Sequence, residues 1–383
     1  MAEVKVAIIT IQYPPTIGGL QRHIKGIVSL AESLGYNTTV ITAEPNPTME
    51  VEGELDNNVI QLPAIGWFKD APIINPVKLY MVLKDINPKI VHVVYPFPIS
   101  LDIASVYARL NKKKLVCTYI DDITVGFPIN KIYEKTLWKI CKYVIDSISV
   151  SSQEYGKNAT GLKDWRKRFY VIPPPVFDEF NLSLSDKYNA KKKLKLEGYD
   201  RVMLFVGGLR KKLTYKRLDL LLRAWAEFNK DEKSNSIFVV IGGGELLDYY
   251  KKMASDLGLT QKNTIFKGYV PRETLIDYYL AADVFVLPSV GTNEGFGIAA
   301  VEAMFYGNAV IASDIPGIRG AVKREEKTHV SLVPPLNWKK IVDELKYWFS
   351  KDLREYALEN HEYVKKFFNK ERIKKELKKL YED

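Results

Sequence analysis

Short runs of β-branched and other apolar residues alternate with helix-like segments along most of this 383-residue chain. The first run, Val4 to Ile11, precedes a helical pattern from Leu20 to Leu34, and similar pairs of segments follow it. A second helical pattern, Val77 to Ile86, has Asn75 as a cap and Pro76 at its first helical position. Alternation of this kind predicts a parallel sheet that is covered by helices on both faces.

Three consecutive prolines, Pro173–Pro175, interrupt this alternation. Proline fixes φ and lacks an N–H donor, so we interpret the run as a domain boundary. A polar stretch through Lys191–Lys193 follows, after which the alternation restarts. We therefore predict an α/β protein with two Rossmann-like halves, 1–175 and 176–355, which are doubly wound parallel sheets facing across a cleft. A helical tail, 356–383, is expected to pack back on the first half.

The composition is that of a globular protein, with 46% apolar and 27% charged residues. No apolar run reaches the roughly 18 residues of a membrane-spanning helix, and the N-terminus lacks the pattern of a signal peptide. We therefore expect a cytoplasmic protein. Two cysteines, Cys117 and Cys141, are too few for a disulfide framework or a four-thiolate zinc site. The four histidines lack metal-ligand spacing, so no metal site is predicted.

The net charge of +10 indicates acidic partners, such as nucleotides, phospholipid headgroups or nucleic acid. The densest basic stretch, Lys365 to Lys379, has eight basic residues against Glu371 and Glu376. It is either a solvated helix face or a contact with an anionic membrane, where an acceptor would lie. The second interpretation places the protein at the inner face of a membrane. No nucleic-acid-binding module is found, so nucleic acid is not an expected partner.

One segment, Pro288 to Gly307, has the features of a ligand-binding site. It follows a predicted buried strand and opens a helix, whose free N–H groups are suited to a phosphate. Its glycines allow the backbone to approach a ligand closely. Two carboxylates, Glu294 and Glu302, are separated by seven residues, so both can face one ligand. Carboxylates accept hydrogen bonds from sugar and ribose hydroxyls.

This segment, with EGFG and EAM around the two glutamates, resembles the signature of the retaining glycosyltransferases of family four (group 1), which have the GT-B fold. The N-terminal IITIQYPPTIGGLQRHI resembles the opening strand and Gly-Gly loop of that family. VGGLRKKLTYKRLDLLLRAW resembles the first strand, loop and helix of its donor domain, and IGGGE, FKGYV and AADVFVLPS follow in the family's order. The resemblance covers nearly the whole chain, and its motifs are specific when taken together.

The resemblance implies a role for each matching residue. Glu302 would hold the ribose hydroxyls of a nucleotide, Glu294 the hydroxyls of the transferred sugar, and Lys216 the diphosphate. Arg210 joins Glu294 and Lys216 as a candidate catalytic residue. The other predicted donor-binding residues are Gly208, Gly243, Val270, Gly295, Phe296 and Gly297, and the predicted phosphate or acceptor loop contains Gly18, Gly19 and Asp121. For some of these a simpler interpretation exists: Lys216 as a solvated lysine, Glu302 as a surface carboxylate, and Gly18–Gly19 and Gly242–Gly244 as ordinary glycine turns.

Two positions depart from the family's pattern. The family commonly has an arginine where this chain has Gly208, and among the cations that follow, Arg210 is the first candidate to replace it. Many members have a histidine where this chain has Ile120, so that Asp121 or Asp122 would supply a hydrogen bond there. A carboxylate cannot replace a neutral imidazole as a hydrogen-bond donor. We therefore expect this chain to bind the sugar or the acceptor differently from family members that have the histidine.

The resemblance implies a hexosyltransferase that moves a sugar from a nucleoside-diphosphate sugar, UDP- or GDP-linked, to an acceptor hydroxyl. Retention of the anomeric configuration, the absence of a metal and the absence of any other cofactor are implied in the same way. The acceptor is expected to be a glycan or a lipid-linked substrate. Three alternatives remain open at this point: a nucleotide-sugar epimerase, a phosphorylase of the same fold, and a non-catalytic nucleotide- or nucleic-acid-binding protein. A dehydrogenase is disfavoured because no GxGxxG follows the first strand.

Overall fold

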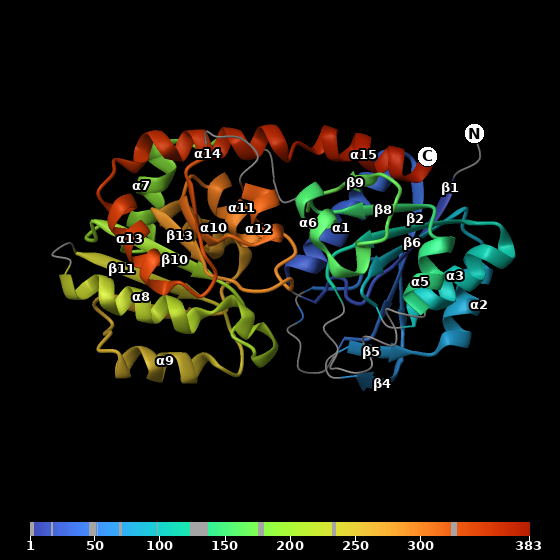
Figure 1. The fold of residues 1–383 in the computed structure, drawn as a ribbon, viewed down its shortest axis with the longest axis horizontal. Helices are drawn as coiled ribbons and strands as arrows, with labels where there is room; N and C mark the ends of the chain where they lie inside the picture. Colours follow the sequence, from blue (N-terminus) through green and yellow to red (C-terminus); the bar gives the residue numbers. More distant parts are fainter. Residues whose placement is uncertain are drawn as a thin grey trace. The chain divides into compact units, whose positions relative to one another are not determined.

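The structure is a computed structural model that describes residues 4–16, 18–45, 51, 53–68, 71–97, 99–122, 137–174, 180–231, 235–322 and 328–383. The contacts within the chain divide it into two compact units. The first unit comprises Met1–Val176 and Phe368–Asp383, and the second comprises Phe177–Phe367. Figure 1 shows the helices and strands of both units.

The first unit contains a seven-stranded parallel sheet in the order β3-β2-β1-β6-β7-β8-β9, so the strand order reverses beside β1. Val6 of β1, for example, lies beside Thr38 of β2 and Ile90 of β6. The strands are β1 (Val4–Ile9), β2 (Tyr36–Ala43), β3 (Val59–Leu62), β6 (Ile90–Tyr95), β7 (Lys114–Tyr119), β8 (Ser147–Val150) and β9 (Phe169–Val171). A separate antiparallel pair is formed by β4 (Ala64–Phe68) and β5 (Ala71–Ile74).

Helices cover both faces of this sheet because its strands are apolar on both sides. Val6 and Ile8 of β1 belong to a core cluster with α1 and α15, whereas Ala7 and Ile9 belong to the cluster with α2, α3 and α5. The helices are α1 (Gly19–Ser33), α2 (Pro76–Ile86), α3 (Ser100–Asn111), α5 (Leu137–Val144), α6 (Gln153–Asn158) and α15 (Lys370–Glu382), with the short 3-10 helix η1 (Thr160–Leu162).

The second unit contains a six-stranded parallel sheet in the order β12-β11-β10-β13-β14-β15, which reverses beside β10. Its strands are β10 (Arg201–Val206), β11 (Ser236–Ile241), β12 (Thr264–Gly268), β13 (Val284–Leu287), β14 (Ala309–Ser313) and β15 (Val330–Val333). Its helices are α7 (Leu184–Lys193), η2 (Lys211–Lys216, a 3-10 helix), α8 (Leu218–Asp231), α9 (Leu247–Asp256), α10 (Arg272–Ala281), α11 (Ile298–Phe305), α12 (Pro316–Val322), α13 (Trp338–Phe349) and α14 (Leu353–Phe367). The predicted fold class, two doubly wound parallel sheets, is confirmed.

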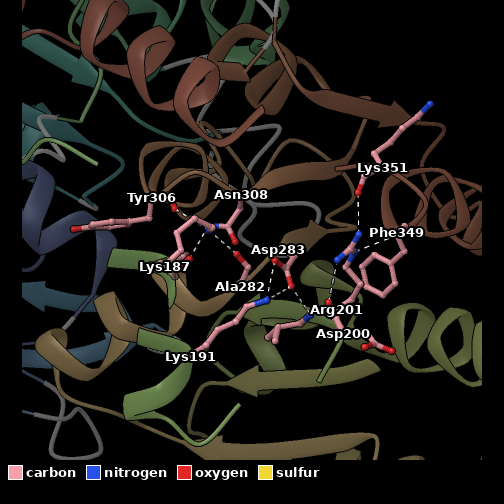
Figure 2. A network of polar contacts seen from close by, with 12 residues as sticks. Lys187, Lys191, Asp200, Arg201, Ala282, Asp283, Tyr306, Asn308, Phe349 and Lys351 are labelled. Carbon is pink, nitrogen blue, oxygen red and sulfur yellow. Dashed lines mark hydrogen bonds and ion pairs between the residues drawn. The ribbon is translucent and has the colours of Figure 1, made fainter. Parts of the chain in front are cut away.

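The lysine-rich stretch after the prolines is helix α7, which begins with a capping box. Figure 2 shows how its lysines hold it to the rest of the second unit. Lys187 Nζ donates a 2.7 Å hydrogen bond to the carbonyl of Ala282, and Lys191 Nζ lies 2.8 Å from Asp283 Oδ2. Burial lowers the pKa of Lys187 to about 8. These lysines therefore fix a helix whose own sequence is too polar to bury much apolar surface.

The predicted helical tail 356–383 is two helices. The first, α14, belongs to the second unit, and only α15 belongs to the first unit. In the first unit Tyr381 of α15 donates or accepts a 2.8 Å hydrogen bond with His92 Nδ1 of β6, and Arg168 forms an ion pair with Glu376 at 3.0 Å. Both cysteines are buried and unbridged. Among the described residues, no helix has the length and apolar character of a membrane span.

Candidate functional site

The candidate site lies at the carboxyl edge of the second unit's sheet. Strands β10 and β13 are neighbours there, at the point where the strand order reverses. In an open parallel sheet the loops that follow such a pair of strands diverge and leave space for a ligand. The loop after β10 leads into η2 and Lys216, and the loop after β13 contains Glu294. Residues 78 positions apart in the sequence are thereby brought together.

Lys216 and Glu294 form an ion pair in which Nζ lies 2.7 Å from Oε2. Their side chains are only 16% and 11% exposed, so water screens the attraction weakly. Ser289, which follows β13, donates its hydroxyl to the same carboxylate oxygen at 3.1 Å. The ammonium and the carboxylate are thus held in place before any ligand binds.

The backbone fixes Lys216 relative to the loop after β13. The N–H of Val290 donates a 2.8 Å hydrogen bond to the carbonyl of Tyr215, which joins η2 directly to that loop. A Cβ atom on Gly207 would lie 2.8 Å from Cδ of Lys216, so the glycine leaves room for the lysine stem. A Cβ on Gly317 would lie 2.0 Å from the carbonyl oxygen of Glu294. The position of the ion pair therefore depends on close backbone packing.

Glu302 lies in α11 and is 1% exposed. Its Oε1 forms a 2.8 Å ion pair with Nη1 of Arg272, the first residue of α10. Its Oε2 accepts a 3.1 Å hydrogen bond from the hydroxyl of Tyr279. A buried carboxylate needs such partners because an unpaired charge in the interior is costly. The apolar sequence around Glu302 predicts a ligand or a cation as its partner, and the structure provides a cation, Arg272.

The start of α11 lies between these two glutamates. Gly297 is its N-cap residue and has a φ of 72°, a left-handed conformation that favours glycine. Phe296 is buried, and the carbonyl of Gly297 accepts hydrogen bonds from Ala300 and Val301 within the helix. The first N–H groups of a helix have no partner within it, so this end can bind an anion. Three predicted donor-binding residues, Gly295, Phe296 and Gly297, therefore lie between the carboxylates.

The triple glycine after β11 packs against the loop after β10. Gly242 and Gly244 have φ values of 151° and 140°, and Cβ atoms on them would lie 1.9 and 2.4 Å from the carbonyl oxygens of Gly207 and Leu209. The carbonyl of Gly243 accepts a 2.8 Å hydrogen bond from the N–H of Leu209. These contacts give the glycines a structural reason for their presence. They also place Gly208 and Gly243 in two loops that contact each other at the edge of the sheet.

Arg210 immediately precedes η2, and a Cβ atom on Gly244 would lie 2.8 Å from its Cγ. The carboxylate of Glu245 accepts a 2.8 Å hydrogen bond from the N–H of Lys211. That bond, with a smaller contribution from the charge of Arg210, lowers the pKa of Glu245. Arg210 therefore lies at the triple-glycine loop. Val270 is half-buried between β12 and α10, two residues before Arg272.

The predicted phosphate or acceptor loop belongs to the first unit. Gly18 caps α1 and Gly19 is the first residue of that helix. Nearby, the buried Gln21 donates to Gln12 at 3.0 Å and to Thr16 at 3.2 Å, so the loop is held by side-chain amides. No charged residue takes part in these two hydrogen bonds.

Asp121 and Asp122, the candidates to replace the missing histidine, follow β7. Asp122 is buried and accepts 3.0 Å hydrogen bonds from the N–H groups of Thr160 and Gly161. It also accepts a hydrogen bond from the hydroxyl of Tyr119. The carboxylate of Asp122 therefore holds η1. Asp121 is then the remaining candidate to replace the missing histidine.

The aromatic residues Tyr95 and Phe97, at and just after the end of β6, are core residues and not an exposed platform for a sugar or lipid. Tyr95 and Phe97 are each 2% exposed. The ring of Tyr95 stacks on those of Tyr119 and Trp138, with centroid distances of 4.9 and 4.5 Å. Their packing is explained by the core, and no acceptor is needed to account for it. Trp67 is 38% exposed, and Phe127 lies outside the described residues.

Three side chains of the site are not evident from the sequence pattern: Ser289, Arg272 and Tyr279. Ser289 directly follows an apolar strand, which is a weak signal for a site residue. Arg272 and Tyr279 lie on α10, and nothing in the spacing of that helix indicates that it contacts α11. Sequence motifs give positions along the chain, whereas these contacts depend on how two helices pack.

The chain belongs to the group 1 glycosyltransferase family. Residues 186–382 match the family described as Glycosyl transferases group 1, and residues 17–180 match Glycosyltransferase Family 4. The first match includes every residue of the site at the edge of the second unit's sheet. The resemblance inferred from the motifs is therefore confirmed.

Curated relatives align with parts of the chain. An uncharacterized glycosyltransferase of Methanocaldococcus jannaschii, MJ1607, is 36% identical over 155 residues, which are 40% of this chain and 37% of that protein. The D-inositol 3-phosphate glycosyltransferase of Nocardia farcinica is 32% identical over 164 residues, which are 41% of this chain and 35% of that protein. The chain thus aligns with little more than a third of the length of these two relatives.

Solved structures align over nearly the whole chain. Sucrose-phosphate synthase from Thermosynechococcus elongatus has a TM-score of 0.71 and 19% identity, covering 99% of this chain and 98% of its own. The Anabaena protein HepE, in complex with UDP and glucose, has a TM-score of 0.72 and 15% identity, covering 98% of this chain and 99% of its own. At these identities the likeness shows the fold, which is the GT-B fold.

Proposed function

We propose that this chain transfers a hexose from a nucleoside-diphosphate sugar to an acceptor hydroxyl, with retention of the anomeric configuration and without a metal ion. The observation that carries the proposal is the buried ion pair between Lys216 and Glu294 at the carboxyl edge of the sheet. The pair places an ammonium cation beside a carboxylate that can accept hydrogen bonds from hydroxyls, next to a helix N-terminus. A nucleoside-diphosphate sugar presents an anion and hydroxyls in the same arrangement.

Sugar transfer requires the diphosphate to leave the anomeric carbon, and negative charge grows on its β-phosphate as the bond breaks. Lys216 and the N–H groups near Gly297 are proposed to meet that charge, and the side chain of Lys216 is only 16% exposed. Each such preorganised donor typically contributes on the order of 3 kcal/mol to lowering the barrier. In the proposed bound state Lys216 turns from Glu294 to the phosphate, and Glu294 accepts hydroxyls of the sugar instead.

Glu302 is proposed to hold the ribose. Arg272 and Tyr279 each contact one of its oxygens, and we propose that the ribose hydroxyls share this carboxylate, since a carboxylate has about four acceptor positions. The 2.8 Å contact with Arg272 fixes the orientation of this carboxylate. Val270, close to the start of α10, is proposed to lie beside the base.

The donor is proposed to be UDP- or GDP-linked, and UDP with glucose is what the structure of HepE contains. For the acceptor we propose a glycan or a lipid-linked substrate. Among the similar structures, the Staphylococcus aureus protein TarM is in complex with α-GlcNAc-glycerol and UDP. Gly18, Gly19 and Asp121 are the proposed contacts with phosphate or acceptor from the first unit.

Two measurements test the proposal. In a thermal-shift panel of UDP, GDP, ADP and their sugars, a ligand of the native state raises the melting temperature. In a transfer assay, Lys216→Ala is expected to reduce turnover by roughly 10²–10³-fold because a donor to the leaving group is lost. Lys212→Ala, an exposed lysine of the same loop, is the matched control and should retain wild-type turnover.

The assay also separates the alternatives. A transferase releases nucleoside diphosphate only when an acceptor is present. An epimerase converts the nucleotide sugar without releasing nucleoside diphosphate. Full turnover in Lys216→Ala, with the fold intact, would contradict the proposed role of the ion pair. Salt-dependent binding of random oligonucleotides without any binding of nucleotide sugars would favour a non-catalytic binding protein.

A further inference from the structure

Three helices of the first unit expose large apolar side chains. Their exposed fractions run from 47% for Leu137 to 91% for Tyr143. The set comprises Val77 and Met81 of α2, Val106 and Leu110 of α3, and Leu137, Ile140 and Tyr143 of α5. We call these seven residues and the basic residues beside them the apolar–basic face. A patch of this kind on a soluble domain usually marks an interaction site.

These side chains share one side of the unit. Helix α3 contacts both α2 and α5, and Figure 1 shows the three helices together. Each helix turns other residues inward, such as Leu83 of α2, Ala104 of α3 and Trp138 of α5, which lie in the core cluster under the sheet's strands. Because a helix has opposite sides, the exposed residues project away from that core. The apolar–basic face therefore extends over the outer surface of α2, α3 and α5.

Its charge is strongly positive. Residues 76–86, 100–113 and 137–144 contain seven basic residues, Lys78, Lys84, Arg109, Lys112, Lys113, Lys139 and Lys142, and two acidic ones, Asp85 and Asp102. Asp102 is half-buried and turned toward α5, with Oδ1 3.6 Å from Sγ of Cys141. In each of the three helices an exposed basic residue adjoins an exposed apolar one in the sequence: Lys78 in α2, Arg109 in α3 and Lys139 in α5. Lys142 is not counted here, because its side chain is 12% exposed and lies 3.7 Å from Asp164.

We propose that the apolar–basic face docks the protein on the surface of a bilayer that contains anionic lipids. Apolar side chains of a surface helix enter the boundary between headgroups and acyl chains, and the lysines and arginines beside them attract lipid phosphates. Tyr143 suits this boundary, since its ring is apolar and its hydroxyl is polar. A protein partner fits less well because lysine is depleted in the centre of protein–protein interfaces, whereas basic residues here adjoin the apolar ones.

This surface differs from the basic stretch Lys365–Lys379, for which a membrane contact is one interpretation of the sequence. The apolar residues of α15, Ile373, Leu377, Leu380 and Tyr381, are all buried in the core of the first unit. The lysines of α15 therefore have no exposed apolar neighbour on their own helix. The docking surface is accordingly assigned to α2, α3 and α5.

Docking itself requires neither a donor nor the transfer reaction, and it adds to the proposed function by bringing the protein to the surface that would hold a lipid-linked acceptor. The test is co-sedimentation of the full chain with vesicles of phosphatidylcholine, with or without phosphatidylserine. We expect binding to the anionic vesicles to exceed binding to the neutral ones by about tenfold or more, and to weaken as salt is added.

Two substitutions on α5, Ile140→Ser and Tyr143→Ser together, are expected to reduce binding to anionic vesicles about tenfold. Tyr188→Ser with Tyr347→Ser is the matched control, because these second-unit side chains are 63% and 48% exposed. Lys375→Gln with Lys378→Gln tests α15. Both controls should bind as the wild type does. All variants should keep the thermal shift produced by nucleotide, so that loss of docking is distinguished from failure of the donor site.

The proposal is overturned if the wild type stays in solution with anionic vesicles, or if the α5 double variant sediments like the wild type. It is also overturned if the α15 variant alone abolishes binding. A concentration-dependent oligomer in vesicle-free solution that the α5 substitutions dissociate would show instead that the face binds a second copy of the chain.

Discussion

The two units have sheets of the same kind but differ in whether their buried polar side chains form ion pairs. In the first unit, a neutral network joins Tyr381 to His92, Thr118 and Ser149 through hydrogen bonds of 2.6–2.8 Å. In the second unit, buried or half-buried charges are paired, as in Lys216–Glu294, Arg272–Glu302 and Lys191–Asp283. Ion pairs of the described first unit, such as Lys25–Asp56, include an exposed side chain.

A neutral network and a buried ion pair have different physical consequences. A neutral network of fully satisfied hydrogen bonds fixes a helix on a sheet and has little to offer an anionic ligand. A buried ion pair contributes little net stability, because desolvation offsets the attraction, but it keeps a cation available. Two of the three pairs in the second unit involve residues of the candidate site, whereas Lys191–Asp283 holds α7 (Figure 2). In the Lys216–Glu294 and Arg272–Glu302 pairs, a ligand can replace one of the two partners.

The largest expected effect comes from breaking one of these pairs. Arg272→Met leaves Glu302 buried without its cation, and removing one partner of a buried pair typically costs 3–5 kcal/mol. Because Arg272 is 34% exposed, we expect a loss of unfolding free energy at the lower end, about 3 kcal/mol. The measurement is chemical denaturation at pH 7.

A double variant, Arg272→Met with Glu302→Gln, makes the test specific. It removes the orphaned charge, and Tyr279 can still donate to the amide oxygen. We expect the double variant to regain most of the stability, with a coupling energy well above the error of the cycle. If the two single losses simply add, the buried charge is not what stabilises this part of the second unit.

How much of this site the sequence predicts depends on the kind of contact. Glu294, Glu302 and Lys216 belong to motifs, and strand topology requires the loops after β10 and β13 to meet. The strand–helix alternation likewise predicts both sheets, because its period is a local property. Arg272 cannot be found in this way, since its partner depends on the packing of α10 against α11. In the sequence the lysines of α7 form only a polar stretch, because the carbonyl and the carboxylate that they contact lie more than 90 residues away.

The second prediction concerns pH and the first unit. Burial lowers the pKa of His23 to about 4 and that of His92 to about 3. An unfolded histidine binds a proton below about pH 6.5, so the unfolded state is protonated in a pH range where the folded state keeps these histidines neutral. The free energy of unfolding therefore falls as the pH decreases from 6.5 toward these values. Between pH 7 and 5 each histidine contributes a loss of about 2 kcal/mol.

Hydrogen exchange of peptides from β6 and β7 at the two pH values would measure this loss in the first unit itself. His92→Gln removes one of the two titrating groups and keeps groups that can bond to Tyr381 and Thr118, so it should reduce the pH dependence by about half. The measured quantity is the change of the unfolding free energy per pH unit, which a general loss of stability does not alter. An unaltered slope in His92→Gln would show that the neutral network is not the acid-sensitive element of the first unit.

The smallest expected effect uses one asparagine cap in each unit. Asn369 Oδ1 accepts hydrogen bonds from the N–H groups of Glu371 and Arg372 at the start of α15, and Asn337 Oδ1 accepts one from Lys340 at the start of α13. Replacing either asparagine by alanine should cost about 1 kcal/mol, while aspartate should preserve the cap. Because α15 also depends on Tyr381 for its attachment to β6, Asn369→Ala should increase hydrogen exchange in α15 and leave α13 unchanged, and Asn337→Ala should do the reverse. Equal changes in both helices after either substitution would mean that the two units unfold as one, and the contrast between their networks would then have no separate effect on stability.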